Sequence, residues 1–282
     1  MSKKIIFYRN RRRYLIVILV LTLILLCFIK YSDTVSFIGS LLPQRWEKIE
    51  EPPPCDCDNS NTKPCKINGI CLHFNYDYRL FFPKEMNLWR GVQFDMNYVK
   101  EALYNIEEFT KNYNPDFLKS NLTDIFIVKE LKCAGKNAGG AHHNSSIYIA
   151  YDLNYPQMPV QAMMHAELSS IIMKKYSFPE NEWRLINKKD FRYSNNVLEV
   201  LGKEETNRLL LDSLEGGFVT EYAKTTLEND FNMIVEMLFY KKDYLCTLRR
   251  RYERINKKAE MAIQFYESIG SGATFEDCKI FK

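Results

Sequence analysis

The stretch Gln161-Ala-Met-Met-His-Ala-Glu-Leu-Ser-Ser-Ile-Ile172 decides the fold of this chain. It lies within residues 160–175, which follow Pro159 and contain no further proline or glycine. That pattern is typical of a helix with proline at its start. Apolar residues recur at three- and four-residue steps and predict a buried stripe of Met164, Leu168, Ile171 and Ile172. A second face is shared by Met163, Glu167, Ser170 and Lys174.

A helix and two strands are predicted ahead of this segment. Asp95 or Asn97 can cap a helix whose apolar positions are Val99, Leu103, Ile106 and Phe109. Residues 125–128 (IFIV) and 147–150 (IYIA) are compact β runs. Between these runs, a tight and irregular loop is indicated by Gly135, Gly139 and Gly140.

The C-terminal third is predicted to be helical. Its apolar residues alternate steps of three and four at Leu245, Leu248, Tyr252, Ile255, Ala259, Ala262 and Tyr266. This stripe suits packing against the chain's own domain, with a partner helix as the alternative. The basic runs Arg249-Arg250-Arg251 and Lys257-Lys258 are interpreted as the solvated side.

The segment 161–172 resembles the active-site helix of zinc-binding metallopeptidases that are common as bacterial surface lipoproteins, which reads His-His-Glu-Phe-x-His-Ile. The matching positions are His165, Glu167, Leu168 and Ile171. Two later stretches match the family's Gly-Phe-Val-Ser-x-Tyr-Ala and Asn/Asp-Glu-Asp-Phe patterns in order and spacing: Gly217-Phe218-Val219-Thr220-Glu221-Tyr222-Ala223 and Leu227-Glu228-Asn229-Asp230-Phe231. The resemblance covers roughly residues 115–265.

This resemblance implies an α+β, zincin-like metallopeptidase fold with a small mixed sheet, an active-site helix and a helical C-terminal half. The predicted order of helix, strand, glycine loop, strand and helix is the layout of the upper half of such a domain. In that layout the second strand, residues 147–150, forms the edge of the substrate cleft, and the next helix carries the metal.

The positions that would hold zinc have lost their ligands. In a His-Glu-x-x-His helix, two histidines four residues apart bind one zinc, and the glutamate takes a proton from metal-bound water. Ala166 and Ser170 occupy the histidine positions, and Asn229 occupies the downstream acidic position. Glu167 remains at the general-base position, where a structural, solvent-facing carboxylate is the simpler interpretation. Tyr222 is interpreted as a packed aromatic residue rather than a transition-state stabiliser.

Other side chains could rebuild a zinc site, and the sequence leaves this alternative open. His165 and Glu167 are two residues apart, so they lie on nearly opposite helix faces and cannot bind one ion together. The remaining substitute ligands are Glu228, Asp230, His142 and His143. For the two adjacent histidines, a polar and exposed loop pair is the simpler interpretation. Since catalytic zinc normally has three good protein ligands, we expect no cofactor unless these side chains converge.

The N-terminal part predicts a membrane anchor and a stem. Residues 14–29 (YLIVILVLTLILLCFI) carry no charge, and most nearby cations precede them. Residues 1–13 are therefore predicted as a cytosolic head and 14–30 as a signal anchor, which gives a single-pass type II protein. A cleaved signal peptide is the alternative, but no small-x-small site follows. Residues 31–72, rich in proline and cysteine, are predicted as a stem, and 73–282 as the zincin-like domain, lumenal or extracellular.

Cysteine use indicates an oxidising compartment. The disulfide candidates beyond the anchor are Cys55, Cys57, Cys65, Cys71, Cys133, Cys246 and Cys278. Their odd number leaves one thiol free or paired between chains. A zinc knuckle is the alternative for the first four, although their spacing matches no common zinc motif. Asn121 and Asn144 begin sequons and are candidates for glycosylation.

The charge distribution gives no support to nucleic-acid binding, because the formal net charge of +4 comes largely from the cytosolic head. The sequence favours a membrane-anchored, catalytically inactive metallopeptidase relative that binds a polypeptide or a protein partner. An active zinc metallopeptidase with a non-standard ligand set is the first alternative. A lumenal glycosyltransferase is the second, but its Asp-x-Asp pattern occurs only in the stem, at Asp56-Cys57-Asp58.

Overall fold

A mixed five-stranded sheet organises the first half of the chain in this computed structural model, which describes residues 66–74, 86–151, 160–201, 210–275 and 278. The strand order is β1 (Lys66–Ile67), β2 (Ile70–His73), β4 (Asp124–Val128), β8 (Ser146–Ala150) and β7 (Gly140–His143). β2, β4 and β8 are parallel, while β1 and β7 run antiparallel at the two edges. The predicted strands at 125–128 and 147–150 are confirmed as β4 and β8.

The segment predicted as an irregular glycine loop is instead β structure. β5 (Glu130–Cys133) and β6 (Lys136–Ala138) form a second, antiparallel sheet with β3 (Trp89–Val92), in the order β3-β5-β6. Gly135 has a φ of 79° in the turn between β5 and β6, a conformation that glycine adopts readily. β7 then follows and pairs with β8. The edge of the larger sheet is therefore β7, and the prediction that residues 147–150 form it is wrong.

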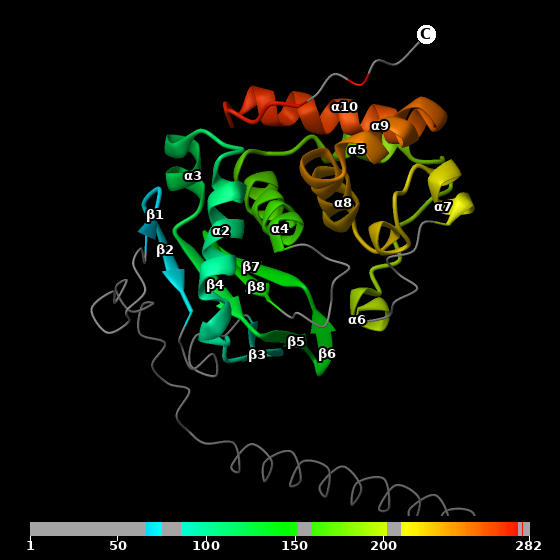
Figure 1. The fold of residues 1–282 in the computed structure, drawn as a ribbon. Helices are drawn as coiled ribbons and strands as arrows, with labels where there is room; N and C mark the ends of the chain where they lie inside the picture. Colours follow the sequence, from blue (N-terminus) through cyan, green and yellow to red (C-terminus); the bar gives the residue numbers. More distant parts are fainter. Residues whose placement is uncertain (1–65, 75–85, 152–159, 202–209, 276–277, 279–282) are drawn as a thin grey trace, which may run out of the picture. The chain divides into compact units, whose positions relative to one another are not determined.

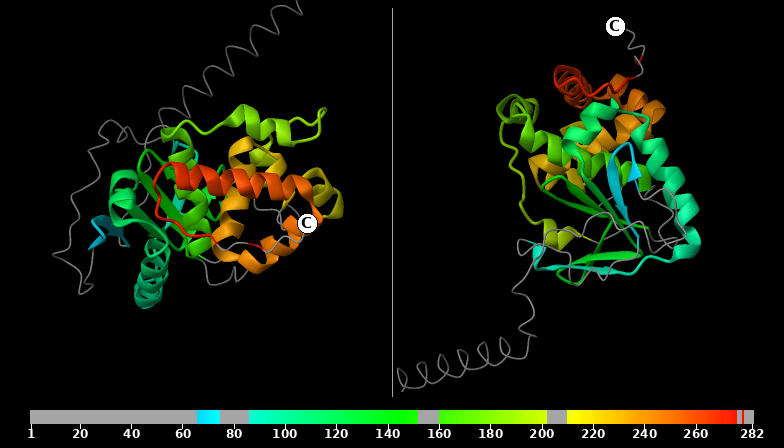
Figure 2. Two further views of the ribbon diagram at one scale, coloured as in Figure 1. Left: turned by 90° about the horizontal axis from the view of Figure 1, so that it is seen from above. Right: turned by 90° about the vertical axis from the view of Figure 1, so that its left-hand side faces the viewer.

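Helices cover one face of the larger sheet and build the C-terminal half (Figures 1 and 2). They are α2 (Val99–Thr110), α3 (Pro115–Asn121), α4 (Val160–Lys175), α5 (Glu180–Ile186), α6 (Val197–Val200), α7 (Leu211–Gly216), α8 (Leu227–Tyr240), α9 (Lys242–Arg251) and α10 (Glu253–Ser268), with the 3-10 turns η2 (Met96–Tyr98) and η4 (Tyr222–Lys224). α4 has the predicted bounds. Asp95 caps η2, from which α2 continues, by accepting a hydrogen bond from the backbone nitrogen of Asn97.

The core lies between the larger sheet and the helices. One face of β4 and β8 packs into the helical core through Ile125, Ile127, Ile147 and Ile149. The alternating residues on the opposite face, Phe126 and Tyr148 among them, pack with the second sheet. α4 is central, because it lies against β7 and β8 on one side and α8 on another. Its buried residues therefore occur around most of its circumference, and not in one stripe.

The C-terminal apolar stripe packs within its own domain, as predicted, but over two helices. Tyr252 has extended backbone angles, φ −127° and ψ 103°, and separates α9 from α10. Two cations that were predicted to be solvated are buried: Arg249 is 7% exposed and Lys258 is 0% exposed. Arg249 Nε donates to Asn256 Oδ1 at 2.9 Å. Burial of such side chains is tolerated when they have polar partners.

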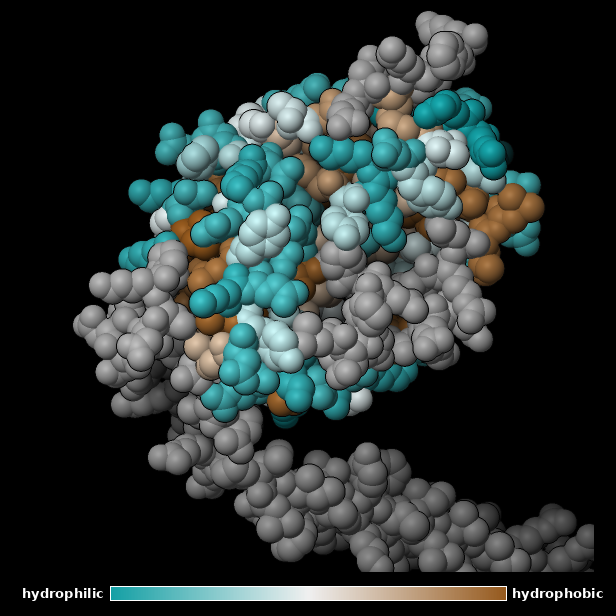
Figure 3. All heavy atoms as spheres, viewed as in Figure 1, coloured by the Kyte–Doolittle hydropathy of each residue, from teal (hydrophilic) through white to brown (hydrophobic). Residues whose placement is uncertain are grey.

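The outer surface seen in Figure 3 is mainly hydrophilic, with an apolar patch over α7. Leu210 and Leu211 are exposed there. The Asn121 side chain, in contrast, is fully buried and donates to the Phe117 carbonyl at 2.7 Å. A folded chain has no room for a glycan at Asn121, whereas Asn144 is exposed in the turn between β7 and β8.

One disulfide joins Cys246 of α9 to Cys278, with their Cα atoms 5.3 Å apart. Cys71 is also disulfide-bonded. Cys133 is the free cysteine among the described residues. Because it is buried, its sulfur would have to become accessible before it could link two chains. The other candidates, Cys55, Cys57 and Cys65, lie outside the described residues.

Residues 66–72 were predicted to belong to the stem, but 66–67 and 70–72 form β1 and most of β2, so the sheet begins before His73. The predicted head (1–13), the anchor (14–30) and the rest of the stem lie outside the described residues. Within the part that is described, no helix combines the length and hydropathy needed to cross a bilayer.

Candidate functional site

Glu167 is held between α4 and the edge strand β7. Its Oε2 accepts a hydrogen bond from His142 Nδ1 at 2.9 Å, and each of the two side chains is 16% exposed. Gly140 makes room for the carboxylate, because a Cβ at that position would lie 2.6 Å from Glu167 Oε1. The interpretation of Glu167 as solvent-facing and of His142 as part of an exposed loop pair is therefore wrong. His143 is half-buried on the same strand.

A lysine and a second glutamate complete this group. Lys174 Nζ lies 2.8 Å from His142 Nε2 and 3.4 Å from a Glu228 carboxylate oxygen. Because an ammonium can only donate, His142 Nε2 accepts this bond, and the Nδ1–H donates to Glu167. His142 Nε2 also lies 3.5 Å from Glu228 Oε1. We call Glu167, His142, Lys174 and Glu228 the cleft cluster.

Tyr222 lies beside this cluster, in the short turn η4. Burial, reinforced by the negative charges of Glu167 and Glu228, raises the pKa of Tyr222 well above its usual range. Its hydroxyl is therefore protonated at neutral pH, and it makes a side-chain hydrogen bond with Asn229. The predicted role of a packed tyrosine with a bonded hydroxyl agrees with this geometry.

The three positions at which the resemblance implies zinc ligands do not fit the ion in this structure. Ala166 has no donor atom. Ser170 Oγ is fully buried and accepts from Asn232 Nδ2 at 2.7 Å, while Ser169 Oγ donates to Asn232 Oδ1 at 2.5 Å. Asn229 Nδ2 donates to the Thr225 hydroxyl at 2.8 Å. The three positions thus carry a methyl group and two neutral side chains that are each bonded to another polar residue, so we derive no zinc chemistry from them.

Two of the substitute ligands lie outside the cleft cluster. His165 is buried, stacks on Phe239 with ring centroids 4.0 Å apart, and shares a 2.7 Å hydrogen bond with the Tyr113 hydroxyl. Burial lowers the pKa of His165 to about 3, so the ring is neutral. Asp230 is fully buried against Lys258. Of the substitutes, only His142 and Glu228 belong to the cleft cluster, and Lys174 contacts both.

A separate group of ligand-type atoms lies in the sheet. Within the described ranges, Cys71, His73 and Asp124 bring three such atoms within 4.8 Å of one another. Cys71 is disulfide-bonded, however, and a disulfide sulfur lacks the thiolate charge that binds zinc. With Cys71 in a disulfide, His73 Nε2 and Asp124 Oδ1 form a 2.7 Å hydrogen bond that links β2 to β4. Burial opposes ionisation of Asp124, but the hydrogen bonds from His73 and Thr123 outweigh it and lower the pKa.

The two later stretches that resemble the family meet at Lys258 of α10. Lys258 Nζ lies 2.7 Å from Asp230 Oδ2 and donates to the Gly217 carbonyl at 2.9 Å. Asp230 Oδ2 also accepts hydrogen bonds from Trp183 and Tyr193. Burial raises the pKa of Asp230 and lowers that of Lys258, and their mutual attraction opposes both shifts. These motifs therefore join α8 to α10 and to the turn after α7, a structural role that needs no metal.

Comparison with known proteins gives one distant similarity in structure. No protein-family model matches the chain, and no curated protein matches it in sequence. The chain is similar to a solved structure described as a "putative zinc-binding metallo-peptidase" from Bacteroides caccae ATCC 43185, with 15% identity and a TM-score of 0.48. The similarity covers 71% of this chain and 80% of that one. Function is therefore argued from the side chains described above.

Proposed function

We propose that this chain is a membrane-anchored, metallopeptidase-like protein that lacks zinc-dependent peptidase activity and binds a polypeptide in its cleft. The observation that carries the proposal is the cleft cluster. Glu167 is bonded to His142, and the Lys174 ammonium contacts both His142 and Glu228. A general base acts on a proton that the metal makes acidic. With Ala166 and Ser170 at the ligand positions, Glu167 has no such proton to take.

The edge strand β7 supports binding of a polypeptide. Among the described strands, β7 pairs with β8 on one side and has no neighbour on the other. An extended peptide can add to such an edge through main-chain hydrogen bonds, while side-chain pockets supply specificity. His142 extends from this strand to Glu167. A peptide lying along β7 would therefore place its side chains near the cleft cluster.

An active peptidase with other ligands is the second candidate, because His142 and Glu228 approach each other beside Glu167. A metal ion there would have to displace the Lys174 ammonium. It would gain one imidazole and one or two carboxylates, and Glu167 could not serve both as a ligand and as the base. This is a poor match to the three protein ligands of catalytic zinc sites.

The zinc content and peptidase activity of the full-length chain, purified in detergent, separate the two candidates. We expect substoichiometric zinc by elemental analysis and equal background hydrolysis of a fluorogenic peptide library by the wild type and Glu167→Gln. Stoichiometric zinc, together with hydrolysis that a chelator and Glu167→Gln both abolish, would establish the second candidate. Binding of the same library without cleavage, measured by fluorescence anisotropy, is the positive result that the proposal requires.

The proposed topology places residues 73–282 in the lumen or outside the cell, and Asn144 tests it. Asn144 is exposed, whereas Asn121 is fully buried. Expressed in eukaryotic cells, the chain should carry a glycan that Asn144→Gln removes and Asn121→Gln does not, seen as a mobility shift after endoglycosidase treatment. A domain that remains in the cytosol would receive no glycan, and the anchor orientation would then be wrong.

A further inference from the structure

A pocket adjoins the cleft cluster and shares Lys174 and Glu228 with it. This side pocket has a volume of about 510 Å³, and its walls come from the end of α4, the start of α8, α5 and the segment ahead of α6. Its other charged or aromatic wall residues are Glu180, Arg184, Arg192 and Tyr193. Because the two sites have residues in common, a chain bound in the cleft can place one side chain in the side pocket.

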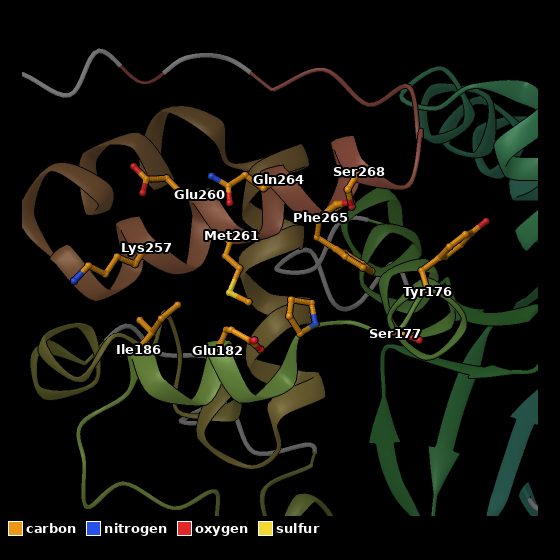
Figure 4. Close-up of a pocket in the computed structure, with 11 residues that line it drawn as sticks. Tyr176, Ser177, Glu182, Ile186, Lys257, Glu260, Met261, Gln264, Phe265 and Ser268 are labelled. Atoms are coloured by element: carbon orange, nitrogen blue, oxygen red, sulfur yellow. The ribbon is translucent and has the colours of Figure 1, made fainter.

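A second groove serves as a comparison. It lies between α5 and α10, has a volume of about 670 Å³, and is lined by residues from Lys257 and Ile186 at one end to Tyr176 and Ser177 at the other (Figure 4). None of its lining residues belongs to the cleft cluster. Its charged side chains are Glu182, Glu260 and Lys257, which give an acidic balance. The two cavities therefore differ in both position and sign of charge.

The side pocket has one more cation than carboxylates. Its two carboxylates each pair with a cation: Glu228 lies 3.4 Å from Lys174, and Glu180 lies 3.3 Å from Arg184. Arg192, the remaining cation, has no carboxylate of the described chain within 4.0 Å. An empty pocket thus presents one positive charge that a ligand can neutralise.

Both arginines have partners that favour particular orientations, although both side chains are exposed. Arg192 Nη1 donates to the carbonyls of Lys189 at 3.1 Å and Phe191 at 2.7 Å, which leaves its other N–H groups for a ligand. The Arg184 guanidinium lies over the Tyr193 ring, 5.4 Å from its centroid. Planar guanidinium groups match the two oxygens of a carboxylate and lose less freedom on binding when they are already oriented.

We infer that the side pocket binds a carboxylate of the polypeptide held in the cleft, either an aspartate or glutamate side chain or the C-terminal carboxylate. The inference rests on the proposed function, because the occupant is part of the cleft-bound chain. A single cation without a carboxylate partner in the described ranges matches a ligand with a single negative charge. Arg192 is the residue that discriminates charge, and Arg184 and Lys174 are already neutralised by their own partners.

The test uses the full-length chain in detergent and labelled peptides that carry glutamate, glutamine or lysine at each position in turn, each with a free or an amidated C-terminus. We expect glutamate peptides to bind about three- to tenfold more tightly than glutamine peptides, the range for a partly exposed ionic contact. Arg192→Gln should remove this preference, and Arg192→Glu should reverse it in favour of lysine. Lys257→Gln, in the other groove, is the matched control and should leave the preference unchanged.

The outcomes are distinguishable. If amidation alone weakens binding, the ligand is the C-terminal carboxylate; if the internal glutamate matters and amidation does not, it is a side chain. Equal binding of the glutamate, glutamine and lysine peptides, or a preference that survives Arg192→Gln in a variant with unchanged thermal melting, overturns the inference and leaves the proposed function intact. Absence of binding by any peptide overturns both.

Discussion

Replacement of Lys258 by methionine tests whether the motif around Gly217 and Asp230 is held together by a buried ion pair. Both charged side chains are 0% exposed, and Lys258 Nζ lies 2.7 Å from Asp230 Oδ2. Methionine keeps the length and apolar volume of the lysine stem but removes the ammonium. The Asp230 carboxylate would keep the hydrogen bonds from Trp183 and Tyr193 and lose its countercharge, while the Gly217 carbonyl would lose its donor.

Breaking a buried pair on one side costs about 3–5 kcal/mol, because the remaining charge has no compensation. For a domain of this size, about 1 kcal/mol shifts the midpoint of thermal unfolding by roughly 2–4 °C, so Lys258→Met should lower it by about 10 °C. The assay is urea and thermal unfolding of the full-length chain in detergent, followed by far-UV circular dichroism. The slope of the urea transition should be unchanged if only stability is affected.

The control is the double variant Asp230→Asn/Lys258→Met, which removes both charges. It should recover much of the loss seen in Lys258→Met, since neutral replacement of a buried pair is far less costly than an orphaned charge. Two results would refute the view that this ion pair holds the motif together. One is a loss below about 1 kcal/mol for Lys258→Met. The other is a loss in the double variant equal to the sum of the losses in Lys258→Met and Asp230→Asn measured separately.

Three further measurements probe other parts of the chain. Burial raises the pKa of Glu236 to about 7 from 4.5. The folded state therefore favours the protonated form of Glu236, and the free energy of unfolding should fall by about 3 kcal/mol as the pH rises from 4.5 through 7. Glu236→Gln should remove this part of the pH dependence of the urea midpoint. Cys246→Ser should cost about 3–4 kcal/mol by releasing the 32-residue link to Cys278. Reductant should destabilise the wild type by more than the variant, because the variant keeps only the Cys71 disulfide among the described cysteines. Gly140→Ala should displace Glu167 from His142 and destabilise the domain by about 1–3 kcal/mol. It should also weaken peptide binding. Unchanged binding would show that the peptide does not bind along β7.

Elements with strong local periodicity could be predicted from the sequence. The bounds of α4 were predicted at residues 160–175 because Pro159 and an uninterrupted apolar pattern define them, and β4 and β8 are compact β-branched runs. β7 was missed because Gly140-Ala-His-His143 carries no β signal of its own; pairing with β8 makes it a strand. That single omission moved the cleft edge to the wrong strand.

Pairings between distant residues could not be predicted in the same way. Glu167, His142 and Glu228 were each candidates, but neither their approach nor the part played by Lys174 follows from spacing within one helix. Lys258 was assigned to solvent because lysine is usually exposed, and its partner Asp230 precedes it by 28 residues. The polarity of a side chain thus indicates its environment only when its tertiary partner is known.

The Lys174 ammonium has a consequence for how such a protein behaves in different surroundings. A charge that belongs to the polypeptide cannot be stripped by a chelator, exchanged for a competing ion or left unfilled when zinc is scarce. Its stoichiometry is set when the chain is synthesised. A binding site of the kind proposed above, organised by such a fixed charge, would keep the same arrangement of side chains in compartments where the supply of trace elements rises and falls.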